Sequence, residues 1–267
     1  MNSFPRVIGF ALAGVASALL AGCGTGKDGT PAFYQVLKKP SPGGFWEGRS
    51  AKGWLLKGVI TESGETLLLV VDDGSQYYGS ISAPETTDLT AASVSGTAEG
   101  YDGNGNYLGT ATMSGTLNVR VSLSGTGFDE FEGTDSANLK YDRQLYERKS
   151  SLDTISGSFT DVVTQDVLTV NKDGTATMLD STTGCIASST VTITDGRYNV
   201  YDVSGTYGAC PPANSAYEGL KFSGVAWLDN TAGNDQPEKL VVAIHSLPTT
   251  AVPLDTALVI GFTRNAS

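Results

Sequence analysis

The chain has 267 residues, and its 17 lysines and arginines face 28 aspartates and glutamates, a formal net charge of −11. This acidity disfavours nucleic-acid binding, which needs a clustered basic footprint on the protein. It also disfavours attachment to anionic lipid by charge. With a single histidine in the chain, a histidine-rich zinc site is excluded by count.

Residues 1–22 have the three parts of an export signal. Arg6 is followed by an uncharged, mostly apolar run from Val7 to Leu20, and two small residues then precede Cys23. The apolar run covers about fourteen residues, and a helix that crosses the hydrocarbon core needs about 20, so a transmembrane anchor is disfavoured. We predict cleavage between Gly22 and Cys23.

The segment Leu20-Ala21-Gly22-Cys23 resembles the lipobox of bacterial lipoproteins. The resemblance implies that the Cys23 thiol receives a diacylglycerol and that its freed amino group is acylated, and we expect no other cofactor. These acyl chains would hold the protein to the membrane. Gly24 at the next position implies sorting to the outer membrane of a Gram-negative bacterium, with the periplasmic or surface side left open. An unmodified cysteine after ordinary secretory cleavage is the alternative.

Beyond the signal, composition changes twice. Residues 23–44 are rich in Gly, Pro, Lys and Thr, which predicts a flexible tether. From Phe45 onward, short runs of Val, Thr, Leu and Tyr alternate with Gly-Asp-Asn-Ser clusters, a pattern typical of antiparallel β-barrels or β-sandwiches. The charged stretch 142–153 lacks glycine and predicts a linker with one helical turn, capped between Ser150 and Asp153.

We therefore predict an all-β protein with two domains, residues 45–142 and 155–267, joined by a linker at 143–154. Each half has about eight expected strands, the number that closes a small barrel, although the pattern leaves barrel and sandwich open. Gly44–Gly48 and Ile155–Phe159 open the two halves in a similar way, which favours duplication of one barrel.

Two local patterns predict particular strands. Leu117, Val119 and Val121 alternate with other residues, so we expect one strand with these three side chains on one face. Residues 189–193 and 198–203 flank an Asp-Gly turn and predict a hairpin.

Cys185 and Cys210 remain after Cys23 and predict a disulfide in an exported chain. It would close a loop of about 26 residues and stabilise the fold by roughly 3.5 kcal/mol in the chain-entropy treatment. No Cys-x-x-Cys spacing supports a redox pair.

A set of short motifs runs through the two halves: Gly44–Gly48, Tyr146–Arg148 with Ser150–Leu152, Gly184-Cys185, Tyr198–Tyr201 and Gly261–Arg264. With these motifs the chain resembles a group of outer-membrane lipoproteins of Gram-negative bacteria. The resemblance implies β-rich domains on a lipid anchor and brings no activity with it.

Candidate catalytic residues are few. His245 could serve as a general base with Ser246, but it follows an apolar run and is better explained as a polar residue at a strand end. Asp102–Asn106 resembles the start of a calcium loop, yet Tyr107 and Met113 stand where that loop needs Gly and Glu, so a hairpin turn is favoured.

Other acidic residues carry weak signals. Asp72-Asp73, and Asp129-Glu130 with Glu132, could bind calcium weakly, although solvated turns explain them as well. Paired carboxylates could also serve glycoside hydrolysis, but some pair always exists among so many acids.

Aromatic residues give the remaining candidates. Trp46, Trp54 and Trp227 are expected to fill barrel interiors or close barrel ends. One of Tyr77 and Tyr78, and one of Tyr198 and Tyr201, is expected to point outward as part of a binding surface.

These observations favour a non-enzymatic outer-membrane lipoprotein that acts in recognition, adhesion or structure. Its partners would be the membrane, through the anchor, and a protein or glycan at the cell envelope or host surface, with no nucleic acid. A second hypothesis is a small-ligand carrier, similar to lipocalins, with one barrel holding an apolar molecule. A third is a hydrolase that uses carboxylates or His245.

Overall fold

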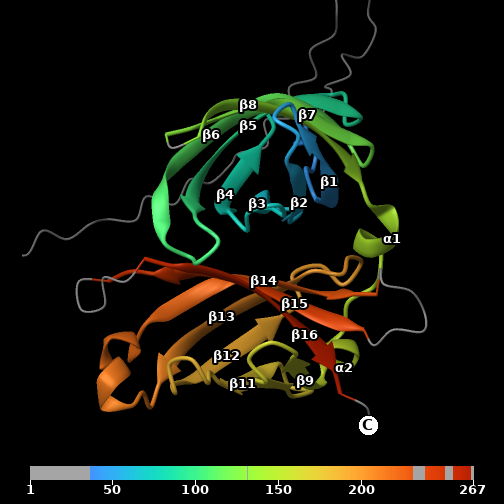
Figure 1. The fold of residues 1–267 in the computed structure, drawn as a ribbon. Coiled ribbons are helices and arrows are strands. Elements are labelled where there is room, and N and C mark those ends of the chain that lie inside the picture. The colour runs from blue at the N-terminus through green and yellow to red at the C-terminus, as the bar shows by residue number, and fades with distance from the viewer. Residues whose placement is uncertain (1–36, 131, 231–237, 250–254, 266–267) are drawn as a thin grey trace, which may run out of the picture. The chain divides into compact units, whose positions relative to one another are not determined.

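The computed structural model describes residues 37–130, 132–230, 238–249 and 255–265, all within one compact unit. In these residues the chain forms sixteen strands arranged as two closed antiparallel barrels (Figure 1). The predicted fold class is confirmed, and the barrel alternative holds over the sandwich. The predicted signal, Cys23 and the tether as far as residue 36 lie outside the described residues.

The first barrel follows chain order, and each strand pairs with the next one. Its strands are β1 (Gly44–Ser50), β2 (Leu55–Ile60), β3 (Glu65–Val70), β4 (Gln76–Ser82), β5 (Ala91–Tyr101), β6 (Tyr107–Asn118), β7 (Ser122–Asp129) and β8 (Gly133–Tyr141). The barrel closes where β1 pairs with β8, with Trp46 opposite Tyr141. Closure leaves no free sheet edge in this barrel.

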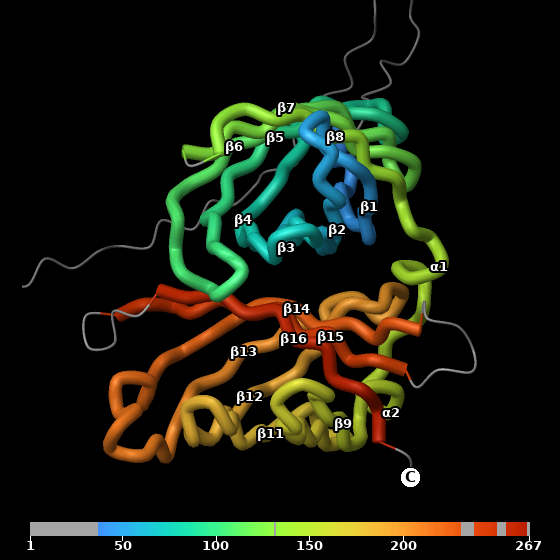
Figure 2. Tube along the Cα trace, in the orientation of Figure 1, coloured from blue at the N-terminus to red at the C-terminus, as the bar shows by residue number. Residues whose placement is uncertain are grey.

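The second barrel repeats this order and closes where β9 pairs with β16. Its strands are β9 (Gly157–Asp161), β10 (Val167–Val170), β11 (Thr175–Leu179), β12 (Ile186–Thr192), β13 (Tyr201–Gly208), β14 (Lys221–Asp229), β15 (Lys239–Leu247) and β16 (Ala257–Arg264). A 3-10 helix, Pro212–Tyr217, precedes β14. Figure 2 follows the same up-and-down path along the Cα trace.

Glycines allow the long strands of the first barrel to bend toward closure. Gly115 of β6 and Gly125 of β7 are register partners. A Cβ on Gly115 would lie 2.1 Å from the Ser124 carbonyl oxygen, so no larger residue fits without a backbone shift. Such positions are where curvature is introduced into a closing sheet.

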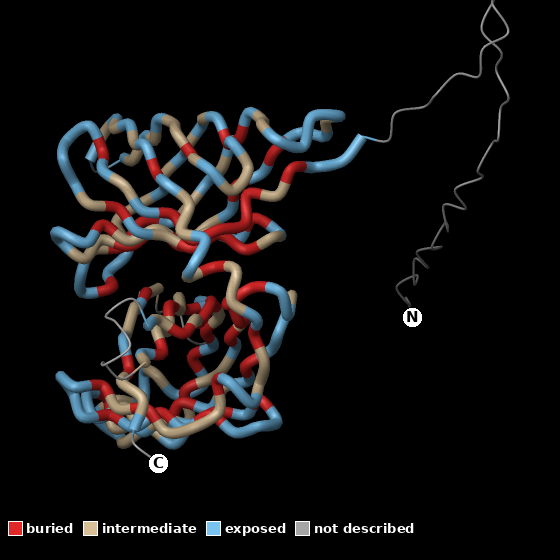
Figure 3. The backbone as a smooth tube through the Cα atoms, turned by 90° about the vertical axis from the view of Figure 1, so that its right-hand side faces the viewer, coloured by how far each residue is buried: buried red, intermediate tan, exposed pale blue. Residues whose placement is uncertain are grey.

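Inward and outward residues alternate along the strands of both barrels, as the buried and exposed bands in Figure 3 show. The inner face of the first barrel contributes one apolar cluster, which includes Trp46, Ile81 and Leu117. The inner face of the second contributes another, which includes Phe159 and Phe262. Two cores of this kind are what two barrels need, since each must bury its own inner face.

A third apolar cluster joins side chains of the two barrels. Phe45 of β1 and Tyr78 of β4 belong to the same cluster as Val225 of β14 and Ala243 of β15. Polar contacts add to it, since the Tyr101 hydroxyl donates to the Asp255 carboxylate at 2.9 Å. The outward faces of these strands are therefore buried without facing a barrel interior.

The segment between the barrels contains two short helices, α1 (Arg143–Tyr146) and α2 (Leu152–Ile155). The Ser151 hydroxyl caps α2 by accepting from the Thr154 amide at 3.0 Å. The predicted capping box at Ser150 to Asp153 was thus wrong by one residue, because Ser151 has the extended backbone that a cap requires.

Two strand predictions are corrected by the structure. Residues 119–121 form the turn between β6 and β7, with Arg120 at a φ of 57°, so Leu117, Val119 and Val121 do not share one strand. The hairpin predicted at 189–193 and 198–203 has its second strand at Tyr201–Gly208, because residues 198–200 turn toward α1, where the Asn199 amide donates to the Tyr146 carbonyl.

Candidate functional site

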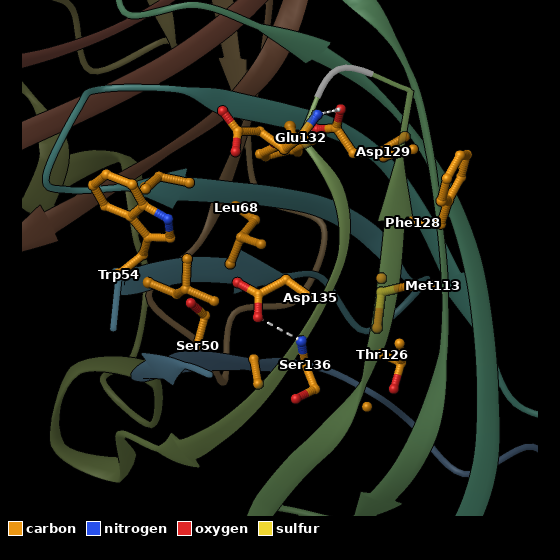
Figure 4. A pocket seen from close by; sticks show the side chains of 18 of the residues that line it. Ser50, Trp54, Leu68, Met113, Thr126, Phe128, Asp129, Glu132, Asp135 and Ser136 are labelled. Carbon is orange, nitrogen blue, oxygen red and sulfur yellow. Dashed lines mark hydrogen bonds between the residues drawn. The ribbon is translucent and has the colours of Figure 1, made fainter. Parts of the chain in front are cut away.

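The first barrel is hollow at one end. A cavity of about 200 Å³ opens where the β1–β2, β3–β4 and β7–β8 turns meet. Trp54, Leu68 and Asp135 point into it from different parts of the barrel wall (Figure 4). Most of its wall is apolar, with a few polar groups at the opening. Concave apolar sites with a few placed polar groups are the usual form of a small-molecule site.

The cavity exists because small residues occupy the inner face of four neighbouring strands. Ala98 of β5, Ala111 of β6, Gly125 and Gly127 of β7, and Ala137 of β8 all line it. At the other end of the barrel the inward residues are large, and Trp46, Ile81 and Leu117 are each at most 2% exposed. The barrel is therefore closed by packing at one end and left open at the other.

The second barrel has the same strand count but a filled interior. Phe159, Tyr207, Phe222 and Phe262 are buried in its core. The remaining space among these side chains is about 50 Å³, too small for a ligand beyond one or two waters. The size of the inward side chains, and not the fold, distinguishes the two barrels.

Polar groups gather at the mouth of the cavity. The Lys52 ammonium lies 3.5 Å from a Glu132 carboxylate oxygen and donates to the Glu132 carbonyl at 2.8 Å. The Asp135 carboxylate accepts from the Ser136 amide at 2.8 Å. Burial tends to raise the pKa of Asp135, but the Ser50 hydroxyl, the Ser136 amide and Lys52 outweigh it and hold that pKa below its ordinary value. Asp135 is therefore an anion at neutral pH.

Tyr77 and Asp129 form a second polar pair in the wall. The Tyr77 hydroxyl donates to an Asp129 carboxylate oxygen at 2.5 Å. Burial, followed by this hydrogen bond to a carboxylate, raises the pKa of Tyr77 far above its ordinary value. The phenol therefore stays protonated and presents its ring to the cavity.

The four tyrosines predicted to form a binding surface do not lie together. Tyr78, Tyr198 and Tyr201 are 6%, 6% and 0% exposed, so the predicted outward tyrosine at 198 or 201 is buried and that prediction was wrong. Tyr78 does face outward from its own barrel, but its hydroxyl reaches the Leu258 carbonyl of the second barrel at 3.2 Å. Only Tyr77 lines the cavity.

The three tryptophans have different positions. Trp46 fills the closed end of the first barrel, as predicted. Trp54 stands in the cavity wall at its mouth and is 37% exposed. Trp227 is not in a barrel interior, and its ring packs 5.3 Å from that of Phe45 in the cluster between the barrels.

His245 lies within β15 rather than at its end. Its Nε2 is 3.4 Å from the Ser223 hydroxyl, and its buried Nδ1 has no hydrogen-bond partner among the described residues. Burial lowers the pKa of His245, and its ring packs 5.1 Å from that of Tyr78. Among the described residues Nδ1 therefore has no partner that would act as the third member of a hydrolytic triad.

The aspartates of the acidic turns accept hydrogen bonds from backbone amides. Asp102 accepts from the amides of Asn104 and Asn106, both at 2.8 Å, which makes this segment the predicted hairpin turn. Asp72 and Asp73 accept from the amides of Leu55 and Ser75. No group of three or more residues suited to a metal ion occurs in the part of the chain that the structure describes.

Cys185 and Cys210 form the predicted disulfide, which is thereby confirmed. The other predicted cysteine site, Cys23 with the cleavage position after Gly22, falls outside the described residues. Among the described residues, no helix combines the length and apolar character that spanning a membrane requires.

The cavity was not predicted from the sequence. The signal was a run of Gly and Ala, interrupted by Met113, at every second position of residues 96–100, 109–115 and 125–127, which face inward once the register is known. No protein-family model, no curated protein and no solved structure matches the chain.

Proposed function

We propose that this protein is a lipid-anchored outer-membrane lipoprotein whose first barrel binds a small apolar molecule. The observation that carries the proposal is the cavity of about 200 Å³ inside that barrel. It favours the carrier hypothesis over surface recognition, because three of the four tyrosines assigned to a recognition surface are buried. The lipobox at Leu20 to Cys23 supports the anchor and the envelope location.

The volume sets the size of the ligand. An apolar protein cavity of about 150 Å³ holds benzene, which corresponds to about 25 Å³ for each carbon. A cavity of about 200 Å³ therefore suits a molecule of about eight carbons. Ala111, Met113 and Leu68 would contact its body, and burial of that surface would drive binding.

Binding of neutral probes tests the proposal. Calorimetric titration of the purified protein with phenethyl alcohol and with octanol should give saturable binding at a single site. Ala111→Leu places a larger side chain in the cavity and should abolish it. Thr110→Leu, which adds apolar surface at the exposed neighbouring position of β6, is the matched control and should bind as the unaltered protein does.

Two results would overturn the proposal. One is the absence of saturable binding for both probes and for related ligands of the same size, charged ones included. The other is equal binding by the Ala111→Leu variant, which would place the site elsewhere. Native mass spectrometry of the protein from its own host adds an independent readout, since a carrier should retain a molecule of matching mass.

A further inference from the structure

The mouth of the cavity is strongly acidic. Asp73, Asp129, Glu132 and Asp135 all line it, and Lys52 is the only basic residue among the described residues of the wall. Lys52 is already paired with Glu132. The opening therefore has an excess of negative charge over an apolar interior, and a low-dielectric wall strengthens its effect on a bound ion.

Aromatic rings stand beside these carboxylates. Trp54 and Tyr77 both line the cavity, from the turn before β2 and from β4. The faces of such rings attract cations, most strongly when the cation is withdrawn from water. Carboxylates and aromatic rings around one opening are the chemistry that recognises an organic ammonium group.

A hydroxyl with free acceptor capacity beside these carboxylates supports the same ligand chemistry. Ser50 lines the cavity and is only 9% exposed. Its hydroxyl interacts with the Asp135 carboxylate and helps to lower the pKa of that group, and its oxygen has no other partner among the described residues. A hydroxyl that donates its hydrogen still has lone pairs that accept, so the Ser50 oxygen can accept an N–H of a ligand.

We infer that the ligand of the first barrel is a small amine: an apolar body of about eight carbons with a cationic nitrogen held at the mouth by Asp135 and Asp73. The Ser50 oxygen would accept one N–H of the same nitrogen. Carboxylate ligands such as fatty acids would be rejected, because their charge would meet the acidic opening. This inference rests on the proposed function, since it names the chemistry of the molecule that the cavity holds.

Three probes of one carbon skeleton separate charge from size: phenethylammonium, phenethyl alcohol and phenylacetate. Titrated at neutral pH and low salt, the ammonium should bind at least about tenfold more tightly than the alcohol, and the carboxylate more weakly than either. Added salt should reduce the preference for the ammonium, because it screens charges at an exposed mouth.

Substitutions of the mouth carboxylates test whether they cause the preference for the ammonium probe. Asp135→Asn with Asp73→Asn keeps the acceptors for the Ser136 and Ser75 amides and removes two charges, so it should abolish the preference for the ammonium over the alcohol. Asp88→Asn is the matched control, because Asp88 is exposed in the turn between β4 and β5, at the opposite end of the barrel. It should leave all three affinities unchanged.

The outcomes separate the two proposals. If the alcohol binds but the ammonium binds no more tightly, the amine inference is wrong and the apolar site stands. If the Asp135→Asn, Asp73→Asn variant keeps the full preference, the charge at the mouth does not select the ligand and the inference also fails. If none of the three probes binds, the proposed function and the inference fail together.

Discussion

Ala111→Leu should make the protein more stable and less able to bind. Ala111 lies on the inner face of β6 and lines the empty end of the first barrel. Leucine adds three carbons, and each buried carbon contributes about 0.8 kcal/mol, or about 2.4 kcal/mol in all. Fixing the leucine side chain costs about 0.5 to 1 kcal/mol. The net gain in the free energy of unfolding is therefore about 1.5 kcal/mol.

The three carbons that Ala111→Leu adds should also prevent ligand binding, because they occupy space in the cavity. At about 25 Å³ for each carbon they occupy about 75 Å³. Of the cavity of about 200 Å³, about 125 Å³ would remain, less than the roughly 150 Å³ that holds benzene. Phenethyl alcohol should therefore no longer enter. Opposite changes in stability and affinity are typical of a site that is kept empty for function.

Urea unfolding and calorimetric titration of the same preparations provide the test. Thr110→Leu should leave both quantities within about 0.5 kcal/mol of the unaltered protein, because surface substitutions of this kind have small effects. A loss of stability in Ala111→Leu would refute the reasoning, since it would mean that the inner face of β6 at this position is already packed.

Three further predictions concern the second barrel. Replacing Cys185 and Cys210 by alanine should lower the free energy of unfolding by about 3.5 kcal/mol, through the greater freedom of the unfolded chain, as measured by urea titration. Asn199→Ala should cost about 3 kcal/mol, because Asn199 is 2% exposed and its side chain donates to the carbonyls of Leu145 and Leu228 and accepts from the Leu228 amide. Burial lowers the pKa of His245 in the folded protein, so the unfolded chain binds the proton first as the pH falls through the ordinary histidine pKa of about 6.5, and stability is lost. His245→Gln removes this titrating group and should therefore reduce the loss of stability below about pH 6.5, as measured by urea unfolding at several pH values.

Each of these has a contradicting result. Equal unfolding curves with and without reductant would show that the disulfide adds nothing. A loss below about 1 kcal/mol in Asn199→Ala would mean that water replaces its hydrogen bonds. For His245, Glu99 and Asp255 favour the charged ring and oppose burial, so an unchanged pH profile in the glutamine variant would show that these effects cancel.

The alternation of residues and the position of turns could be predicted from the sequence, because both depend on neighbours along the chain. A strand places every second side chain on one face, and Gly-Asp-Asn clusters supply the turns, whichever sheet the strand joins. Two sets of about eight strands follow from such local patterns, and the pairing of Cys185 with Cys210 follows from the number of cysteines in an exported chain; the structure confirms both.

Tertiary structure decided which faces are buried. Tyr78 points out of its barrel, as an outward residue should, and is still only 6% exposed because strands of the second barrel lie against it. Leu117 and Val121 alternate in sequence but are separated by a turn at Arg120. The burial of Tyr78 depends on contacts between residues far apart in the chain, and the turn at Arg120 interrupts the strand, and periodicity contains neither.

The cavity is the clearest case. Ala98, Ala111 and Gly127 are unremarkable as single residues, and only strand register places them on one inner wall. Phe159, Phe222 and Phe262 come together in the second barrel in the same way and fill it. Composition and alternation determined that two antiparallel β-domains of about eight strands form, and strand pairing in the structure closes each into a barrel. The free volume inside each barrel depends on side chains from all eight strands, so only the assembled structure shows which barrel contains a cavity.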